Sequence, residues 1–318
     1  MRTVFVVSGG DAPGINTVLG NYIRLAVQNG DTVLGANGGF PGLLDNQIVP
    51  LTFDKIVPWT GRGGSILASS RDPVLNQAEA GEHLKTILRD NAIDNIVLFG
   101  GNGTLRYIPP LLRDWGIPII GLPTTIDNDV PGTEMTLGFD SACNFAYHSI
   151  DGAMATAHAL RGRIFLLETL GGNCGNLALA VAYGADAHAA ILPEYPYEDL
   201  WLSERITNAL KNDGYALVVI CEGARGARTL ADDIPKWTGT RVRDVRLGHA
   251  QRGGVASHRD RVLAADMAHA AYTAFKSGVQ AGIACVTNGT LTIRKDSLEQ
   301  FNLPAPDRTL YNRINGLD

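Results

Sequence analysis

The stretch that decides the fold reads Thr3-Val4-Phe5-Val6-Val7-Ser8-Gly9-Gly10-Asp11-Ala12-Pro13-Gly14-Ile15. Its first five residues are β-branched or aromatic, which is typical of a buried strand. A glycine turn follows, and the segment from about Ile15 to Val27 has the spacing of an amphipathic helix. The stretch therefore predicts the strand, turn and helix that open a βα unit.

The same rhythm of short apolar runs and longer segments with helical period recurs along the chain. Near-continuous apolar strands are covered by helices on both faces, so we predict an α/β fold with mostly parallel sheets. A length of 318 residues and a hydrophobic content of 45% favour two lobes rather than one. The further predicted strands are residues 95–99, 118–122, 164–167, 216–220 and 283–286, and a helix is predicted at 104–114.

The charge and cysteine content argue against several classes of protein. A formal charge of −5 with no run of Lys or Arg gives no electrostatic footprint for nucleic acid or an anionic membrane. The four cysteines stand far apart, which argues against a zinc or redox pair and against a disulfide framework. The chain starts with an apolar strand instead of a signal peptide, and no apolar stretch reaches the roughly 18 residues of a membrane span. We therefore expect a cytoplasmic protein with no nucleic-acid or membrane partner.

Two glycine loops follow predicted strands and suit a phosphate. They are residues 8–14 and Gly100-Gly101-Asn102-Gly103-Thr104. Glycine lets backbone amides and a helix N-terminus approach an anion beyond the carboxyl end of a strand. Neither loop spells G-x-G-x-x-G or a Walker A motif, which argues against a P-loop NTPase and a dinucleotide-binding protein. The alternative is that both are only tight turns between a strand and a helix.

A third glycine segment, residues 61–65, leads to Ser69-Ser70-Arg71-Asp72 and adds an arginine. The guanidinium fork of an arginine matches two phosphate oxygens at once. The alternative for this arginine is a solvated position on the surface.

An acidic turn, Pro123-Thr124-Thr125-Ile126-Asp127-Asn128-Asp129, follows another apolar strand. A carboxylate within hydrogen-bond reach of a sugar hydroxyl can accept its proton while a bond to phosphorus forms. The alternative is an Asx turn that caps a helix.

Taken together, these segments resemble the phosphofructokinase family over essentially the whole chain. The resemblance implies two Rossmann-like lobes, with residues 1–138 and 251–303 binding the phosphoryl donor and residues 139–250 and 304–318 binding the sugar phosphate. It lies in Gly9 to Asn16, in Gly100 to Thr104, in the Thr125-Ile126-Asp127-Asn128-Asp129 motif and in Leu247-Gly248-His249-Ala250-Gln251-Arg252-Gly253-Gly254.

The resemblance also implies a role for each matching residue. Asp127 would be the base, with Thr125 and Asp129 beside it, and Arg71 would steady the charge of the transition state. Asn102 would help to hold Mg²⁺. The donor would be bound by Gly10, Arg71, Gly101, Asn102, Gly103 and Thr104, and the sugar phosphate by Arg163, Leu170, Glu222, Arg243, His249 and Arg252.

The chain departs from the family pattern at several of these positions. Asn102 replaces an aspartate, which removes one negative charge from the metal site. Residues 168–172 replace the usual M-G-R motif, so that Leu170 and Gly172 change the contacts with the substrate. At the two positions that distinguish donors, Gly103 leaves room for a nucleotide and Thr124 supplies no lysine charge for pyrophosphate, which favours ATP.

The leading hypothesis is an ATP-dependent 6-phosphofructokinase of glycolysis that uses Mg²⁺. The resemblance further implies a homo-oligomer, a tetramer in preference to a dimer, because Arg163 and Arg243 would reach the sugar phosphate of a neighbouring subunit. Two alternatives stay open. One is a kinase of the same family that acts on another sugar or cyclitol phosphate or uses pyrophosphate. The other is a catalytically weak regulatory subunit that binds a sugar phosphate.

Overall fold

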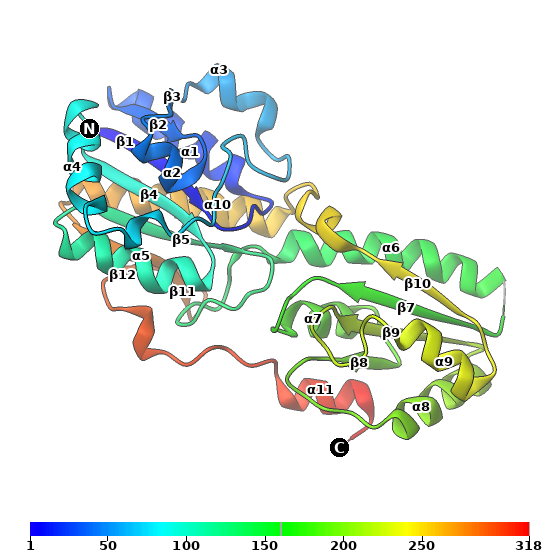
Figure 1. Cartoon of the computed structure of the whole chain (residues 1–318). Coiled ribbons are helices and arrows are strands. Elements are labelled where there is room, and N and C mark those ends of the chain that lie inside the picture. Colours follow the sequence, from blue (N-terminus) through cyan, green and yellow to red (C-terminus); the bar gives the residue numbers. More distant parts are fainter. Residues whose placement is uncertain (160, 318) are drawn as a thin grey trace. The chain divides into compact units, whose positions relative to one another are not determined.

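The computed structural model describes residues 1–159 and 161–317, and Figure 1 traces them. The strands are β1 (Arg2–Ser8), β2 (Thr32–Ala36), β3 (Ile48–Pro50), β4 (Asn95–Gly100), β5 (Ile119–Thr125), β6 (Leu137–Gly138), β7 (Arg163–Thr169), β8 (Ala189–Ile191), β9 (Tyr215–Cys221), β10 (Val242–Arg246), β11 (Ala281–Thr287) and β12 (Thr290–Arg294). The α-helices are α1 (Ile15–Gln28), α2 (Gly39–Leu44), α3 (Phe53–Ile56), α4 (Ala80–Asp90), α5 (Asn102–Asp114), α6 (Phe139–Ala159), α7 (Asn176–Gly184), α8 (Asp199–Asn212), α9 (Leu230–Thr238), α10 (His258–Lys276) and α11 (Arg308–Asn315). The 3₁₀ helices are η1 (Val57–Trp59), η2 (Val74–Asn76), η3 (Gly248–Arg252) and η4 (Leu298–Gln300).

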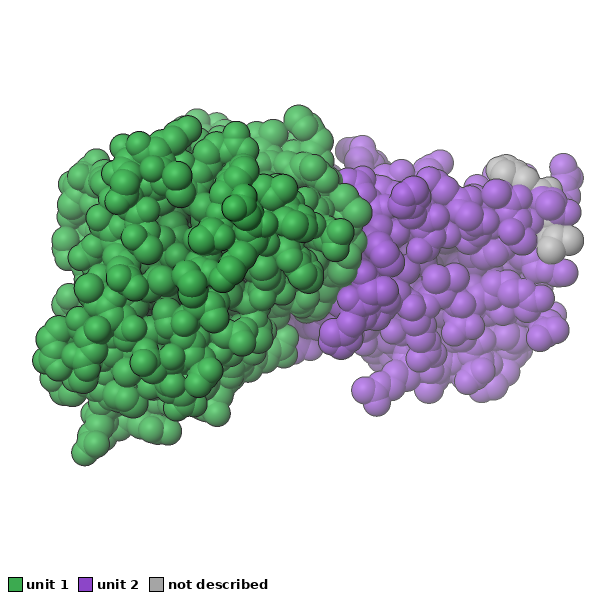
Figure 2. Space-filling model, turned by 90° about the horizontal axis from the view of Figure 1, so that it is seen from above, with its two compact units in different colours: residues 1–141, 252–303 green, residues 142–251, 304–318 purple. Residues whose placement is uncertain are grey.

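The chain folds into two compact units, which are coloured separately in Figure 2. Unit 1 comprises residues 1–141 and 252–303, and unit 2 comprises residues 142–251 and 304–318. The chain passes from unit 1 to unit 2 after residue 141, three residues later than expected from the sequence. It returns to unit 1 after residue 251, one residue later than expected. The third crossing falls at the expected place, between residues 303 and 304.

The sheet of unit 1 has the strand order β12-β11-β5-β4-β1-β2-β3, with β6 beside β5. Its inner strands run parallel, and the edge strands β3 and β12 pair antiparallel with their neighbours. Phe5 and Val7 pack with α1 and α10 on one face. Val4 and Val6 pack with α2, α4 and α5 on the other. Because side chains alternate between faces along a strand, an unbroken apolar run is what two covered faces require.

The sheet of unit 2 has the strand order β10-β7-β9-β8, and every pair in it is parallel. Ile164 and Leu166 of β7 pack with α8 and α9 in one buried cluster. The edge strand β10 carries the charged residues Arg243, Asp244 and Arg246. The predicted α/β class with mostly parallel sheets is confirmed in both units.

Two general properties complete the description of the fold. No helix in the ranges 1–159 and 161–317 is long and apolar enough to cross a membrane. The four cysteines, all of which lie in the described ranges, are not joined to one another by disulfide bonds.

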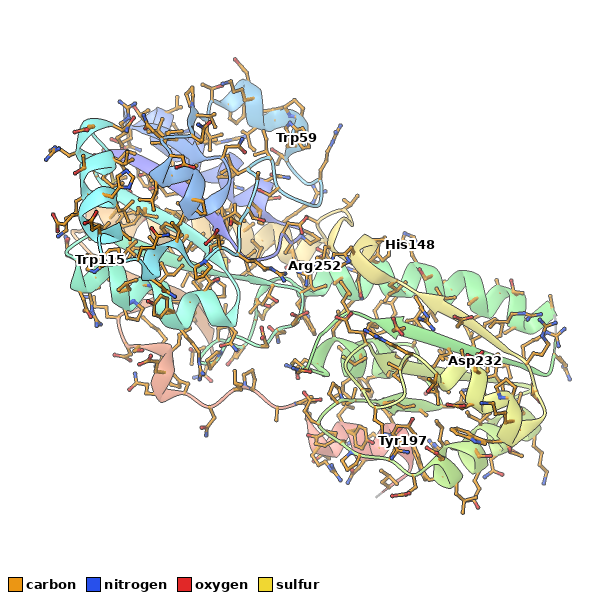
Figure 3. All side chains as sticks on the ribbon, viewed as in Figure 1. Trp59, Trp115, His148, Tyr197, Asp232 and Arg252 are labelled. Atoms are coloured by element: carbon orange, nitrogen blue, oxygen red, sulfur yellow. The ribbon has the colours of Figure 1, made fainter. Side chains whose placement is uncertain are left out.

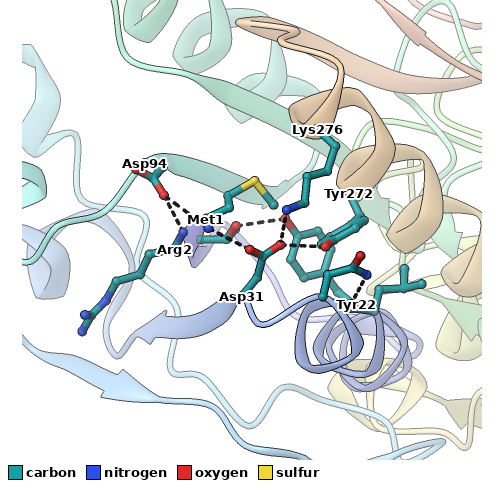
Figure 4. A network of polar contacts seen from close by, with 10 residues as sticks. Met1, Arg2, Tyr22, Asp31, Asp94, Tyr272 and Lys276 are labelled. Carbon is teal, nitrogen blue, oxygen red and sulfur yellow. Dashed lines mark hydrogen bonds and ion pairs between the residues drawn. The ribbon is translucent and has the colours of Figure 1, made fainter.

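A buried carboxylate, Asp31, fastens one end of α10 to the sheet of unit 1 (Figure 4). Its side chain is only 5% exposed. It accepts hydrogen bonds from the amino group of Met1 at 2.7 Å and from the Tyr272 hydroxyl at 2.6 Å, and it pairs with Lys276 at 2.7 Å. Burial alone would raise the pKa of Asp31, but the hydrogen bonds from Lys276, the amino terminus and Tyr272 together lower it to about 2.

This network predicts a pH-dependent contribution to stability. A pKa lowered from 3.8 to about 2 stabilises the fold above pH 3.8, and the stabilisation is lost as the pH falls through 2. We expect Asp31→Asn to lower the free energy of unfolding at pH 7 by about 2 kcal/mol, because three donors lose their charged acceptor. Urea unfolding between pH 7 and pH 3 measures the difference, which should shrink with acidification. A difference that stays constant with pH would contradict this account.

Candidate active site

A cavity of about 390 Å³ opens in unit 1 at the carboxyl ends of β1, β4 and β5. Ligands bind at this edge in open parallel sheets. The cavity brings together all the donor and catalytic residues expected from the sequence. Its lining consists of Ser8, Gly9, Gly10, Arg71, Asp72, Pro73, Gly101, Asn102, Gly103, Thr104, Tyr107, Ile108, Thr124, Thr125, Asp127, Asp129 and Arg252.

Two arginines converge on Gly10 from distant parts of the chain. The segment that ends in Arg71 is held against β1 by a parallel bridge between Ser8 and Ser70. Arg252, which is labelled in Figure 3, donates a hydrogen bond from Nη1 to the carbonyl of Asp11 at 3.3 Å. A Cβ atom on Gly10 would lie 2.7 Å from Nη1 of Arg252 and 3.4 Å from Nη2 of Arg71. Glycine at position 10 therefore leaves room for both guanidinium groups. Arg62, the other arginine near this segment, is exposed and stacks on Trp59 instead.

The second glycine loop leads into α5, which begins at Asn102, two residues earlier than predicted. Thr104 fixes this first turn by donating from its hydroxyl to the carbonyl of Ser8 at 3.1 Å. The free amides of a first helical turn attract negative charge. A Cβ atom on Gly103 would meet nothing within 4 Å, so this side of the cavity is open.

The acidic turn projects into the same cavity and does not cap a helix. The Asp127 amide donates to the Thr125 hydroxyl at 3.1 Å. Asn128 has a φ of 49°, a left-handed conformation that asparagine tolerates better than most residues. Its Oδ1 atom accepts a hydrogen bond from the Thr136 amide at 2.9 Å. The next helix, α6, begins only at Phe139, so the helix-capping alternative is wrong.

The carboxyl of Asp129 is electrostatically strained. Burial and the neighbouring charge of Asp127 raise its pKa to about 6, against hydrogen bonds from its own backbone amide and the Asn102 side chain. The Oδ1 atoms of Asn102 and Asp129 are buried and accept no hydrogen bond from any described residue. Buried oxygen atoms that lack a donor beside a second carboxylate form a suitable environment for a hard cation such as Mg²⁺.

No group of three or more His, Cys, Asp or Glu side chains in residues 1–159 and 161–317 could form a metal cage. Mg²⁺ usually takes one or two protein oxygens and completes its shell with water and phosphate, and the buried oxygens of Asn102 and Asp129 are of that kind. The residues present therefore fit a cation that arrives together with a phosphorylated ligand.

A second cavity, of about 250 Å³, shares Gly103, Tyr107 and Asp72 with the first. Its remaining walls include Phe40 and Leu75, so it is more apolar. Tyr107 was not among the site residues predicted from the sequence. The signal was its spacing, because residues four apart lie on the same face of a helix and Tyr107 follows Gly103 by four.

The remaining predicted substrate residues lie in unit 2. Leu170 and Glu222 come directly after the last residues of β7 and β9, and His249 follows β10 within η3. Arg163 is instead the first residue of β7, and Arg243 pairs with Phe165, close to the same end. Arg163 and Arg243 therefore lie at the amino ends of the strands, and the other three residues lie at the opposite, carboxyl ends.

The accessibility of these residues differs widely. His249 and Arg243 are exposed, and Glu222 is exposed while one of its carboxylate oxygens accepts from the Gly172 amide at 3.0 Å. Leu170 is only 5% exposed, and its amide donates to Gln251 at 2.9 Å. In this chain Leu170 is mainly a packing residue.

Parallel strands, glycine loops at their carboxyl ends and paired carboxylates near two guanidinium groups are features of an α/β phosphotransferase. A sequence profile of the family described as phosphofructokinase matches residues 2–275. The chain belongs to the phosphofructokinase family.

Curated relatives match almost end to end. The ATP-dependent 6-phosphofructokinase of Aquifex aeolicus is 34% identical over 315 residues, which is 98% of each chain. That of Lactobacillus gasseri is 35% identical over 304 residues, which is 95% of this chain and 94% of the relative.

Solved structures share the fold. The phosphofructokinase of Saccharomyces cerevisiae superposes with a TM-score of 0.87 at 22% identity; all of this chain is covered, but it spans only 47% of the yeast chain. A pyrophosphate-dependent phosphofructokinase from Marinobacter aquaeolei has a TM-score of 0.86 at 23% identity, covering 99% of this chain and 87% of its own.

The raised pKa of Asp129 predicts how pH affects the metal-free protein. Because the pKa of Asp129 is raised from 3.8 to about 6 by folding, ionisation of this carboxyl costs stability in the folded state. The cost is absent below pH 3.8 and is complete once the pH has risen through 6. We expect Asp129→Asn to be more stable than the wild type at pH 8 by about 2 kcal/mol and equally stable at pH 4.

Urea unfolding in the presence of a chelator measures this difference. Asp90→Asn is the matched control, because the Asp90 side chain is 59% exposed, and it should change stability at neither pH. A loss of stability in Asp129→Asn at pH 8 would show that the carboxylate is not strained.

Proposed function

We propose that this chain is an ATP-dependent 6-phosphofructokinase, which transfers the γ-phosphoryl group of ATP to the 1-hydroxyl of fructose 6-phosphate. The observation that carries the proposal is the cavity of unit 1, where Asp127 and Asp129 share one space with Arg71, Arg252 and the glycine loops. The names of the near full-length relatives agree with it. Unit 1 would bind the donor and unit 2 the sugar phosphate.

In the proposed reaction Asp127 accepts the proton of the sugar hydroxyl. The hydroxyl oxygen forms a bond to the γ-phosphorus, while the bond from that phosphorus to the β–γ bridging oxygen breaks and leaves its electron pair on ADP. Such a step depends on positioning and charge, because the protein forms no covalent bond itself. Thr125 supports the base, because its hydroxyl accepts the Asp127 amide and so fixes the turn.

The positive groups of the cavity offset the charge that develops on the transferred phosphoryl group. Arg71 is exposed at the cavity and can place its fork on phosphate oxygens. Gly10, Gly101 and Thr104 leave backbone amides accessible to the same anion. When bound, Mg²⁺ would neutralise and orient the donor phosphates. Asn102 would hold it, together with Asp129, through the buried oxygens that lack a donor.

Two features favour ATP over pyrophosphate. The apolar cavity beside Gly103 offers space for a nucleoside, which pyrophosphate lacks. Thr124 lines the main cavity, but its hydroxyl donates to the carbonyl of Leu122 at 2.9 Å and brings no positive charge. Cysteines that are not joined by disulfide bonds fit a reducing compartment, so we propose that the enzyme is cytoplasmic.

The positions of the clamp residues in unit 2 support a homo-oligomer, a tetramer in preference to a dimer. Arg163 and Leu170 are separated by seven residues of strand, or about 23 Å at 3.3 Å per residue. One small sugar phosphate cannot contact both ends of the sheet in a single copy. We propose that Glu222 and His249 of one copy bind the same sugar phosphate as Arg163 and Arg243 of a neighbouring copy. Such a shared site requires a closed assembly.

The proposed base is tested by Asp127→Ser. We expect the turnover number with fructose 6-phosphate to fall at least a hundredfold, because general base catalysis contributes factors of about 10²–10⁴. The KM for fructose 6-phosphate should stay within threefold. A coupled assay of ADP release measures both quantities. Near wild-type turnover would refute the assignment of Asp127 and, with it, the proposed mechanism.

The shared acceptor site is tested by mixing two inactive variants. Copies with Asp127→Ser keep their arginines, and copies with Arg243→Ala keep the base, so a hybrid assembly contains some complete sites. After mild dissociation and reassembly, activity should return to a substantial fraction of the wild type. Asp127→Ser mixed with Arg252→Ala is the control, because Asp127 and Arg252 line one cavity of one chain. No recovery in the first mixture, or equal recovery in both, would contradict the shared site.

A further inference from the structure

A second buried carboxylate of unit 1, Asp260, lies near the amino end of α10 and has no exposed surface. Three donors point at it. The Gly138 amide donates to Oδ1 at 2.9 Å, the Ser141 amide donates to Oδ2 at 2.8 Å, and the Ser141 hydroxyl donates to Oδ2 as well. The partners lie 122 and 119 residues away in the sequence, so Asp260 joins distant segments.

These contacts cap two helices at once. Gly138 and Ser141 flank the start of α6, so Asp260 satisfies amides that the first turn of α6 leaves without partners. Ser257 caps α10 by accepting the Asp260 amide at 3.2 Å, and the Ser257 amide donates to the Ser141 hydroxyl at 2.9 Å. The Asp260 carboxylate thus caps α6 from a position in the first turn of α10, whose own cap is Ser257.

The segment held by Asp260 is β6, which lies beside the acidic turn. Leu137 and Gly138 pair with Thr124 and Thr125, the last residues of β5. The hydroxyl of Thr136, one residue before β6, donates to the Thr125 carbonyl at 2.7 Å. A displacement of β6 therefore moves the strand end from which the acidic turn projects.

The opposite side of β6 packs against the opening glycine loop. A Cβ atom on Gly138 would lie 2.6 Å from Cβ of Ala12, and a Cβ atom on Gly14 would lie 2.6 Å from Cδ1 of Leu137. Both segments that β6 touches contribute residues to the main cavity, Gly10 from one and Asp127 from the other. The space between them is too tight for β6 to shift alone.

We propose that Asp260 is a positioning residue for phosphoryl transfer, which fixes β6 and thereby sets the distance between the opening glycine loop and the Asp127 turn. The inference rests on the proposed function, because it assigns the two segments to the donor and the base. Displacements of about 1 Å can cost a factor of 10² in rate without contact with the substrate. The carboxylate is needed because it accepts all three hydrogen bonds, whereas an amide would turn its NH₂ group toward a backbone donor.

Asp260→Asn is the test variant, and Asp31→Asn is its matched control. Asp31 is also a buried carboxylate, and it fastens the other end of the same helix through Tyr272 and Lys276. It does not line the cavity. We expect Asp260→Asn to lower kcat tenfold to a hundredfold with the KM for fructose 6-phosphate within threefold. Asp31→Asn should lower the unfolding temperature but leave kcat within twofold of the wild type.

Amide hydrogen exchange supplies a second readout that needs no activity. Asp260→Asn should increase exchange in peptides that cover residues 9–14 and 123–138, and Asp31→Asn should not. Ser141→Ala removes one of the three donors and replaces Asp260→Asn in the test if that variant does not fold. It should show a smaller increase in exchange in the same peptides and a threefold to tenfold loss of kcat.

The outcomes separate the proposed kinase function from the positioning role of Asp260. An inactive wild type refutes the proposed function, and the exchange data then decide on the positioning role alone. An active wild type with unchanged kcat and unchanged exchange in Asp260→Asn and Ser141→Ala would overturn the role proposed for Asp260. A loss of unfolding temperature without either change would reduce Asp260 to a purely structural anchor.

Discussion

Repulsion between two carboxylates in a partly dehydrated cavity is the constraint on which the site depends. The burial of Asp129 and, next to it, the charge of Asp127 raise the pKa of Asp129 to about 6, so ionisation of Asp129 is opposed by its surroundings. Arg71, Arg252 and the amides of the glycine loops surround the pair with positive potential. In the proposed function, a cation bound with a polyphosphate would relieve this repulsion, so donor binding and the protonation state of the pair would be coupled.

Holding such a pair in place requires a stiff scaffold, which the topology provides. Both carboxylates follow β5, a central strand whose neighbours β4 and β11 run parallel to it. The short strand β6 then closes the gap between β5 and the opening loop, and Asp260 fixes β6 from α10. Asp31 fastens the far end of the same helix to the start of the sheet. Two buried carboxylates thus hold α10 at both ends, but only Asp260 also holds β6, the strand beside the acidic turn.

The sequence predicted what local pattern and spacing determine. The apolar runs at residues 95–99 and 216–220 became strands, and both glycine loops met at one cavity because parallel strands end at one edge of a sheet. The edge strand β10 was missed because its charged residues Arg243, Asp244 and Arg246 interrupt the apolar pattern. Contacts between distant segments carry no local signal, so the bridge that sets Arg71 beside Gly10 and the hydrogen bonds of Asp260 emerged only from the structure. The roles of the individual site residues remain predictions.

Phosphorus nuclear magnetic resonance of the wild-type chain tests the central claim most directly, because one spectrum identifies both the donor product and the new ester. With Mg²⁺, ATP and fructose 6-phosphate, we predict one new phosphomonoester resonance, at carbon 1 of the sugar, for each ADP formed. Pyrophosphate in place of ATP should give no such resonance. The account would be contradicted if ATP yielded only ADP and inorganic phosphate, or if pyrophosphate supported the transfer and ATP did not.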